Sequence, residues 1–176
     1  NDLGEVIGSD KNDEGKIFLN TQSWAVISGV AEGERAKICM QSVTEHLETP
    51  KGPKILHPPY TVIDDSIGLA TRCVPGKKEN GAVFNHPVSW AILAEAINGN
   101  AKRAFEIYKK ALPMNPELDI ERYEVEPYVY AEYVTSPDHP TYGQASHSWL
   151  TGSSTWMLRD GIDAILGIKP LYNGLE

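Results

Sequence analysis

The sequence has little of what marks a disulfide-rich, metal-binding or membrane protein. Only two cysteines occur, Cys39 and Cys73, and they show no C-x-x-C spacing, so no disulfide framework or zinc site is indicated. We interpret both as reduced thiols of a cytoplasmic protein. No stretch approaches the roughly 20 apolar residues of a membrane-spanning helix, and no signal peptide opens the chain.

Basic residues are also scarce. Sixteen Lys and Arg stand against 24 Asp and Glu, which gives a net charge of −8 and excludes a surface built for nucleic acid or anionic membrane. A small anion such as phosphate remains possible, because it needs only a few local donors. The histidines share no spacing typical of metal ligands, and no Gly-rich nucleotide loop occurs, so we expect no metal and no cofactor. The histidines are His46, His57, His86, His139 and His147.

Three tryptophans recur at a fixed distance along the chain. Trp24, Trp90 and Trp156 are separated by two equal intervals of 66 residues, and each follows a Ser or Thr and opens an apolar stretch. Equal intervals with the same local pattern indicate a structural repeat. The alternative is three ordinary buried tryptophans with an accidental spacing.

The apolar periodicity and the Gly and Pro positions predict helical hairpins within this repeat. Pro87 suits the first turn of a helix, and Gly99 suits its end. The segments between hairpins, 56–85 and 124–148, contain too many aromatic and aliphatic residues for disorder, so we expect ordered loops gathered at one end. The predicted helices are 24–30, 34–47, 87–98, 101–112 and a last one from about 152–154 to 167.

Two loop segments offer groups that suit an anion. His86 precedes Pro87 at a predicted helix start, where unpaired N–H groups favour negative charge, although it could simply cap the helix. Thr151 and Gly152 introduce two serines at the start of the last helix, an arrangement that presents several donors or is an ordinary serine cap.

Other polar residues suit a sugar. Lys78 and Glu79 lie shortly before His86, and could equally be a solvated charge pair. Glu126 and Glu132 lie among tyrosines. Carboxylates accept hydrogen bonds from sugar hydroxyls, and aromatic rings stack on the C–H faces of sugar rings. The residues alone therefore predict a helical-repeat protein whose loop face binds an anion and a sugar.

These segments resemble the inverting cellobiose, cellodextrin and chitobiose phosphorylases of glycoside hydrolase family 94. The resemblance spans nearly the whole chain, and segment 131–140 is most similar to cellodextrin-type members. It implies an all-α fold, in which residues 1–176 form the C-terminal part of an (α/α)6 barrel made of helical hairpins with long ordered loops. The matching segments are 15–24, 75–86, 126–133, 148–152 and 165–170.

The resemblance also implies a reaction. Such enzymes cleave a β-glucoside with inorganic phosphate as nucleophile and co-substrate, and release an α-sugar 1-phosphate with inversion. One protein carboxyl then suffices, as general acid to the leaving oxygen.

Site residues follow by matching position. His86, Thr151 and Gly152 resemble the residues that bind phosphate. Lys78 and Glu79 resemble contacts to the transferred sugar. Glu132 falls where several relatives carry Gln, and Cys73 falls where relatives vary with the acceptor sugar.

The resemblance places the general-acid aspartate upstream of the match, so we expect no catalytic acid in this chain, and no activity from the chain alone. The N-terminal β-sandwich and the first hairpins of such enzymes would also lie outside it. For the full-length protein we expect a homodimer that binds phosphate and a disaccharide or oligosaccharide. Two alternatives remain: a non-catalytic carbohydrate- or phosphate-binding module, and a glycoside hydrolase or transferase on the same barrel.

Overall fold

A computed structural model describes residues 1, 3–115, 119–149 and 152–175. Its main elements are two helical hairpins and a further long helical segment, as expected from the repeat. The first hairpin is α1 (Leu19–Ile27) with α2 (Gly33–His46), and the second is α3 (Asn85–Ile97) with α4 (Ala101–Ala111). The last segment is α6 (Ser153–Arg159), which continues as the π-helical η2 (Asp160–Ile165). The short helices are η1 (Leu69–Arg72) and α5 (Ile120–Tyr123).

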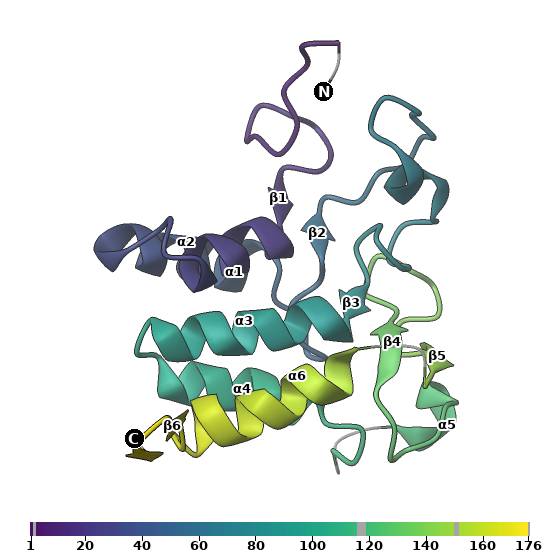
Figure 1. The fold of residues 1–176 in the computed structure, drawn as a ribbon. Coiled ribbons are helices and arrows are strands. Elements are labelled where there is room, and N and C mark those ends of the chain that lie inside the picture. The colour runs from purple at the N-terminus through teal and green to yellow at the C-terminus, as the bar shows by residue number, and fades with distance from the viewer. Residues whose placement is uncertain (2, 116–118, 150–151, 176) are drawn as a thin grey trace.

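Helix α3 lies at the centre of the helical layers (Figure 1). It contacts α1 on one side and α6 on the other, while α4 packs against it as its hairpin partner. Its sequence explains this place, because Val88, Ala91, Ile92 and Ala94 are all fully buried and point to more than one face. Helix α4 has a single buried face instead, formed by Ala104, Ile107 and Ala111 at helical spacing.

The three repeated tryptophans meet in space. The ring centroids of Trp24 and Trp90 are 5.4 Å apart, those of Trp90 and Trp156 are 6.2 Å apart, and those of Trp24 and Trp156 are 6.3 Å apart. All three pairs have edge-to-face geometry, which is favourable for aromatic rings. The 66-residue interval therefore reflects a structural repeat in which α1, α3 and α6 occupy equivalent places.

The expected all-α class is wrong in part, because the loops contain short antiparallel strands. Ordered loops must pair their buried backbone N–H and C=O groups, and strand pairing does this here. The strands form three small sheets. β1 (Ile17–Phe18) pairs with β2 (Leu56–His57); β3 (Val83–Phe84), β4 (Ala131–Val134) and β5 (Ala145–Ser148) form one sheet in that order; β6 (Pro170–Leu171) pairs with β7 (Gly174–Leu175).

The hairpins are confirmed, but the described residues do not form a closed barrel. The predicted helix bounds are close for α2, α3 and α4. The first helix differs most: it begins at Leu19 rather than Trp24, because Phe18 is the last extended residue and the chain turns helical directly after it. The last segment ends before Gly167, whose φ of +69° lies in the left-handed region typical of helix ends.

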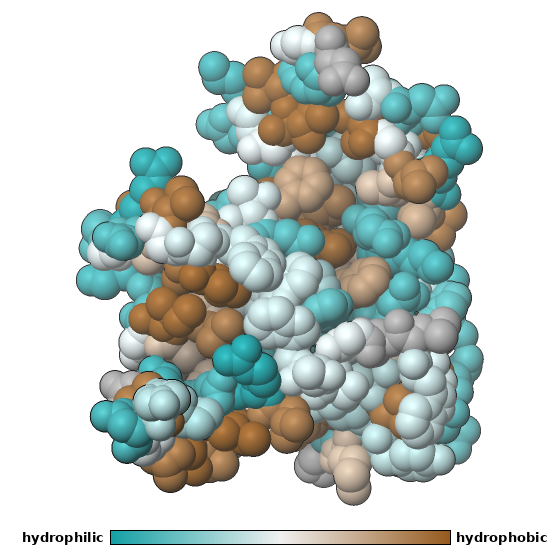
Figure 2. All heavy atoms as spheres, viewed as in Figure 1, coloured by the Kyte–Doolittle hydropathy of each residue, from teal (hydrophilic) through white to brown (hydrophobic). Residues whose placement is uncertain are grey.

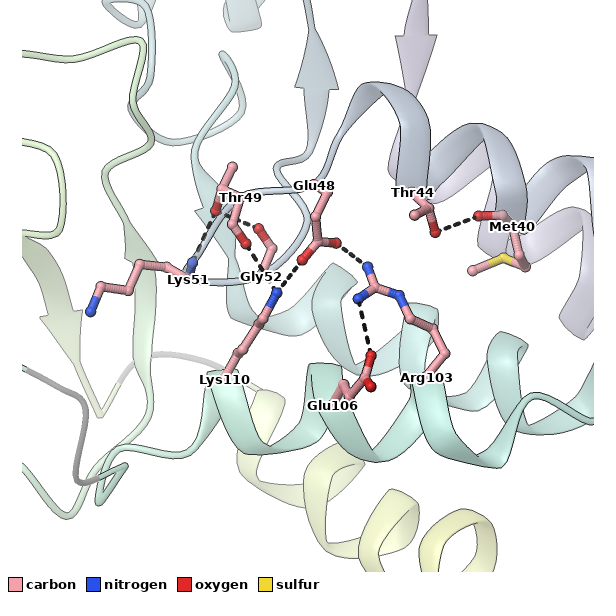
Figure 3. A network of polar contacts seen from close by, with 9 residues as sticks. All are labelled: Met40, Thr44, Glu48, Thr49, Lys51, Gly52, Arg103, Glu106 and Lys110. Carbon is pink, nitrogen blue, oxygen red and sulfur yellow. Dashed lines mark hydrogen bonds and ion pairs between the residues drawn. The ribbon is translucent and has the colours of Figure 1, made fainter.

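An ionic network joins the two hairpins (Figure 3). Glu48, just beyond the end of α2, binds Arg103 with one carboxylate oxygen and Lys110 with the other. Lys110 also donates to the carbonyl oxygen of Thr49 at 3.4 Å, and Arg103 lies 3.7 Å from Glu106. The carboxylate of Glu48 thus ties α4 to the end of α2.

Hydrophobic side chains remain exposed along the helices. Figure 2 shows hydrophobic surface over the helices, and also over the N-terminal segment at the top of the view, where Leu3, Val6 and Ile7 are exposed. Val30 and Ile38 are exposed on the first hairpin, and Leu158 and Leu166 on the last helical segment. Among the described residues, no helix is both long and apolar enough to cross a membrane.

Candidate functional site

The three-stranded sheet brings distant parts of the loop segments to one edge. Phe84 of β3 pairs with Tyr133 of β4, and Ala131 of β4 pairs with Ser148 of β5. Asn85, which follows β3, extends this pairing, because its side-chain amide donates to the carbonyl oxygen of Ala131 at 2.8 Å. The residues next to this edge are therefore neighbours, although more than 60 positions separate the first from the last. They include His86, Glu132 and Trp149.

His86 lies in the first turn of α3 and rests on two of the repeated tryptophans. Its ring centroid is 4.7 Å from that of Trp90, one helical turn later, and 6.3 Å from that of Trp156. Burial lowers the pKa of the His86 imidazole below its usual 6.5, so the ring is neutral at pH 7. Its Nε2 atom is buried and has no hydrogen-bond partner among the residues that the structure describes, which is costly unless a ligand supplies one.

Gly152 lies directly against His86. A Cβ atom added at Gly152 would be 3.0 Å from Cε1 and 3.4 Å from Nδ1 of the imidazole. Gly152 therefore leaves the space that the ring occupies, at the point where α6 begins. The structure thus brings together two of the three residues that we matched to phosphate binding. The third, Thr151, lies outside the described residues.

The segment before β3 groups the expected sugar contacts. Cys73 is a free thiol whose Sγ lies 3.8 Å from Oε2 of Glu79. Burial, followed by the charge of Glu79, raises the pKa of the Cys73 thiol. Lys78 is half-buried and has a φ of +46°. Among the described residues, no hydrogen bond or ion pair joins this group to His86.

Asn80 holds this segment in place, a role that the sequence did not reveal. Its side chain is fully buried and donates to the carbonyl oxygens of Tyr60 at 2.8 Å and Cys73 at 2.7 Å. Its Oδ1 accepts from the backbone N–H of Tyr60 at 2.8 Å. The Asn80-Gly81 pair marks a turn in the sequence, but these long-range contacts are not visible there.

Glu132 has an acceptor without a partner. Its Oε2 atom is buried and accepts no hydrogen bond within the described part of the chain, and Nδ1 of His147 lies 3.4 Å from it. The same Nδ1 is 2.7 Å from Oγ of Ser146. Because Nδ1 of His147 is already engaged with Ser146, the Oε2 atom of Glu132 is available to a donor from a ligand. His147 was also missed by sequence reasoning.

Metal binding finds no support in the arrangement of ligands. Within residues 1, 3–115, 119–149 and 152–175, no group of three or more His, Cys, Asp or Glu side chains is placed to hold a metal ion. The groups that the candidate site offers to a ligand are the His86 imidazole, the Glu132 carboxylate and the N–H groups at the start of α3.

Comparison with known proteins shows the family to which the chain belongs. The sequence pattern described as "Glycosyl hydrolase 94 superfamily, catalytic domain" matches residues 1–167. The chain belongs to the glycosyl hydrolase 94 superfamily. This confirms the family resemblance. The family is one of helical barrels, but the described residues show two helical hairpins and a further helical segment without a closed barrel.

Several proteins with similar sequences are phosphorylases that act on different sugars. The chain is 41% identical to a solabiose phosphorylase of Paenibacillus borealis over 100% of its own length, and 39% identical to an N,N'-diacetylchitobiose phosphorylase of Vibrio proteolyticus over 98%. It is 35% identical over 99% to a 3-O-beta-D-glucopyranosyl-beta-D-glucuronide phosphorylase of Paenibacillus borealis. The chain spans only 22% to 23% of the length of these three relatives.

Proposed function

We propose that the protein to which this chain belongs cleaves a β-glucosidic bond with inorganic phosphate, with inversion, and releases α-glucose 1-phosphate. The observation that carries this proposal is the His86 imidazole, which lies against Gly152 and whose buried Nε2 has no hydrogen-bond partner among the described residues. The superfamily match and the phosphorylase relatives support the same reaction.

The residues near the sheet edge would hold the phosphate. The neutral His86 imidazole donates one hydrogen bond, and the N–H groups at the start of α3 add partial positive charge. A phosphate oxygen then attacks the anomeric carbon while the bond to the leaving oxygen breaks. The leaving oxygen takes its proton from a general acid, which we place upstream of this chain. No cofactor enters this scheme, because phosphate is the nucleophile.

The carbohydrate would be held by the remaining matched residues. Lys78, Glu79 and Glu132 bind the transferred sugar, and the free oxygen of Glu132 accepts from one of its hydroxyls. We propose a cello-oligosaccharide or a related disaccharide as the substrate. The small half-buried thiol of Cys73 leaves space on the acceptor side, which favours longer or varied acceptors. A homodimer and a cytoplasmic location stay predictions for the full-length protein.

The test is product release from cellobiose and cellotriose by the full-length protein, with and without inorganic phosphate. We expect α-glucose 1-phosphate, identified by its anomeric NMR signal, only when phosphate is present. Release of free glucose without phosphate would support a hydrolase instead. Binding of sugar without any turnover would support a non-catalytic module. The 176-residue chain alone, as a matched control, is expected to release nothing.

A further inference from the structure

Trp149 differs from the other three tryptophans. Those three pack edge to face on one another, whereas the Trp149 side chain is 69% exposed at the end of β5. Its φ of +70° lies in the left-handed region, which a tryptophan rarely adopts. The backbone therefore holds this residue in an unfavourable conformation, an arrangement that often accompanies a binding role.

The edge of the Trp149 ring is anchored, so that its faces remain open. The indole Nε1–H donates to Oε1 of Glu126 at 3.1 Å. Hydrogen bonds from the Ser148 side chain and from Trp149 keep the pKa of the Glu126 carboxyl below its usual range. Glu126 is therefore ionised at pH 7 and fixes the orientation of an exposed aromatic ring.

The surroundings of this ring suit a neutral sugar better than an anion or a nucleic acid. Tyr128, two residues after Glu126, is 67% exposed and adds a second open aromatic side chain. Glu126 accepts from the indole and from the Ser148 side chain, and a carboxylate oxygen has a second lone pair that can also accept from a hydroxyl group. A carboxylate beside open aromatic rings repels phosphate groups, whereas a pyranose offers C–H faces to the rings and hydroxyl groups to the carboxylate.

The position of Trp149 connects this surface with the candidate site. Ser148, its neighbour, pairs with Ala131 at the sheet edge next to His86. Gly152, which touches His86, follows Trp149 by three residues, a chain length of at most roughly 11 Å. A sugar on the indole face would therefore lie beside the proposed phosphate position.

We propose that Trp149, oriented by Glu126 and flanked by Tyr128, stacks on a pyranose ring of the carbohydrate substrate. The inference rests on the proposed function for the identity of that substrate, but it concerns binding and does not require turnover. Trp149 binds the ring face, Glu126 fixes the indole, and phosphate contacts neither side chain.

The test measures binding to the full-length protein by isothermal titration calorimetry, with cellobiose, cellotriose or N,N′-diacetylchitobiose in one series and inorganic phosphate in another. For Trp149→Ala we expect the Kd of the sugar to rise about tenfold, and the Kd of phosphate to stay within about twofold. Trp149→Phe should keep most of the affinity, because it retains an aromatic face. Tyr172→Ala, which removes an exposed aromatic residue far along the chain, should change neither Kd.

Glu126 provides a second variant that does not alter the ring. Glu126→Gln keeps an oxygen acceptor for the indole and should keep sugar affinity within about threefold of the original, whereas Glu126→Ala releases the ring and should weaken binding more. Both variants should leave the phosphate Kd unchanged. Loss of sugar affinity in Glu126→Gln alone would contradict the orienting role.

Several results would overturn the proposal. One is an unchanged sugar Kd in Trp149→Ala, and another is an equal loss of sugar and phosphate affinity. A third is a change in the molar mass of the protein in solution without any effect on sugar binding, which would make Trp149 a protein contact. Failure of the unaltered protein to bind any of the three sugars would also refute it. Intact sugar binding that depends on Trp149, without phosphate-dependent turnover, would instead refute only the proposed function.

Discussion

Glu48 and Glu132 are two glutamates with the same exposure and opposite surroundings. Each side chain is 23% exposed. Both carboxylate oxygens of Glu48 bind cations, Lys110 on one and Arg103 on the other (Figure 3). Glu132 has a buried oxygen that accepts no hydrogen bond.

The difference separates structural from functional polar residues in this molecule. A half-buried carboxylate that is fully paired holds elements together, as Glu48 does between the hairpins. A half-buried carboxylate that is left unpaired costs stability unless something outside the chain completes it. The same reasoning applies to the unpaired Nε2 of His86. Under the proposed function, an unpaired polar atom beside the sheet edge, rather than burial alone, marks the residues that contact a ligand.

The largest expected effect is on phosphate affinity. Replacing His86 by Ala removes the donor whose Nε2 lacks a partner in the protein, so the Kd of phosphate should rise about a hundredfold. Sugar affinity should fall much less. Calorimetric titration of both ligands checks this, and His139→Ala is a control at another partly buried histidine. Equal losses of phosphate and sugar affinity would count against the assignment.

The next largest effect is on stability, at Glu48. Glu48→Ala leaves Arg103 and Lys110 without their shared carboxylate and should reduce the free energy of unfolding by about 2.5 kcal/mol. Phosphate and sugar affinities should not change. Urea denaturation followed by circular dichroism measures the loss. A loss below about 0.5 kcal/mol, the scale of an exposed ion pair, would show that the network contributes little.

Asp160 lacks partners for a different reason than Glu132, because burial favours the protonated form of its carboxyl. It is 1% exposed, neither oxygen has a hydrogen bond, and burial raises its pKa to about 7 from 3.8. The folded state therefore binds a proton more tightly than the unfolded state. This stabilisation is fully present below about pH 4 and is lost as the pH rises through about 7.

Asp160→Asn removes that pH dependence. We expect the variant to be more stable than the original by about 2 kcal/mol at pH 8, and the two to converge near pH 4. Thermal unfolding between pH 4 and pH 8 tests the sign. Lower stability of the variant at pH 8 would mean that a charged partner completes Asp160 in the full-length protein.

The smallest expected effect on stability is at Glu132. Glu132→Gln keeps the size of the side chain and removes a charge that has no hydrogen-bonded partner, so the free energy of unfolding should change by less than about 0.5 kcal/mol. Sugar affinity and preference should change instead. Urea denaturation, as for Glu48→Ala, and calorimetric titration with sugar measure the two effects. A stability loss as large as that of Glu48→Ala would remove the distinction between the two carboxylates.

The hairpins could be predicted from the sequence because helices are indicated by local signals such as apolar spacing and the positions of Pro and Gly. Apolar spacing, Pro87 and Gly99 mark α3 within a few residues, and the tryptophan interval predicted the equivalence of α1, α3 and α6. The short strands could not be predicted, because two-residue pairs such as Ile17–Phe18 with Leu56–His57 leave no periodic pattern. Their pairing depends on long-range contacts that the sequence does not display.

The residues of the candidate site could be proposed from the sequence, but the contacts that connect them could not. His86, Gly152 and Glu132 could be named from motif position, and the structure places His86 against Gly152. The hydrogen bonds of Asn80 and the Trp149–Glu126 pair depend on how the loops fold back, so no local signal revealed them. Loop geometry is determined by contacts between residues far apart in the sequence, and these contacts could not be predicted from the sequence.

The most direct test of the central claim is the NMR response of the His86 imidazole to inorganic phosphate in the full-length protein. We predict a saturable shift of its ring signals, with a Kd that matches the KM for phosphate in sugar 1-phosphate release. The signals of His57 and His139 should stay unchanged and serve as internal controls. Phosphate-dependent turnover without any change at His86 would contradict the account, because phosphate would then bind elsewhere.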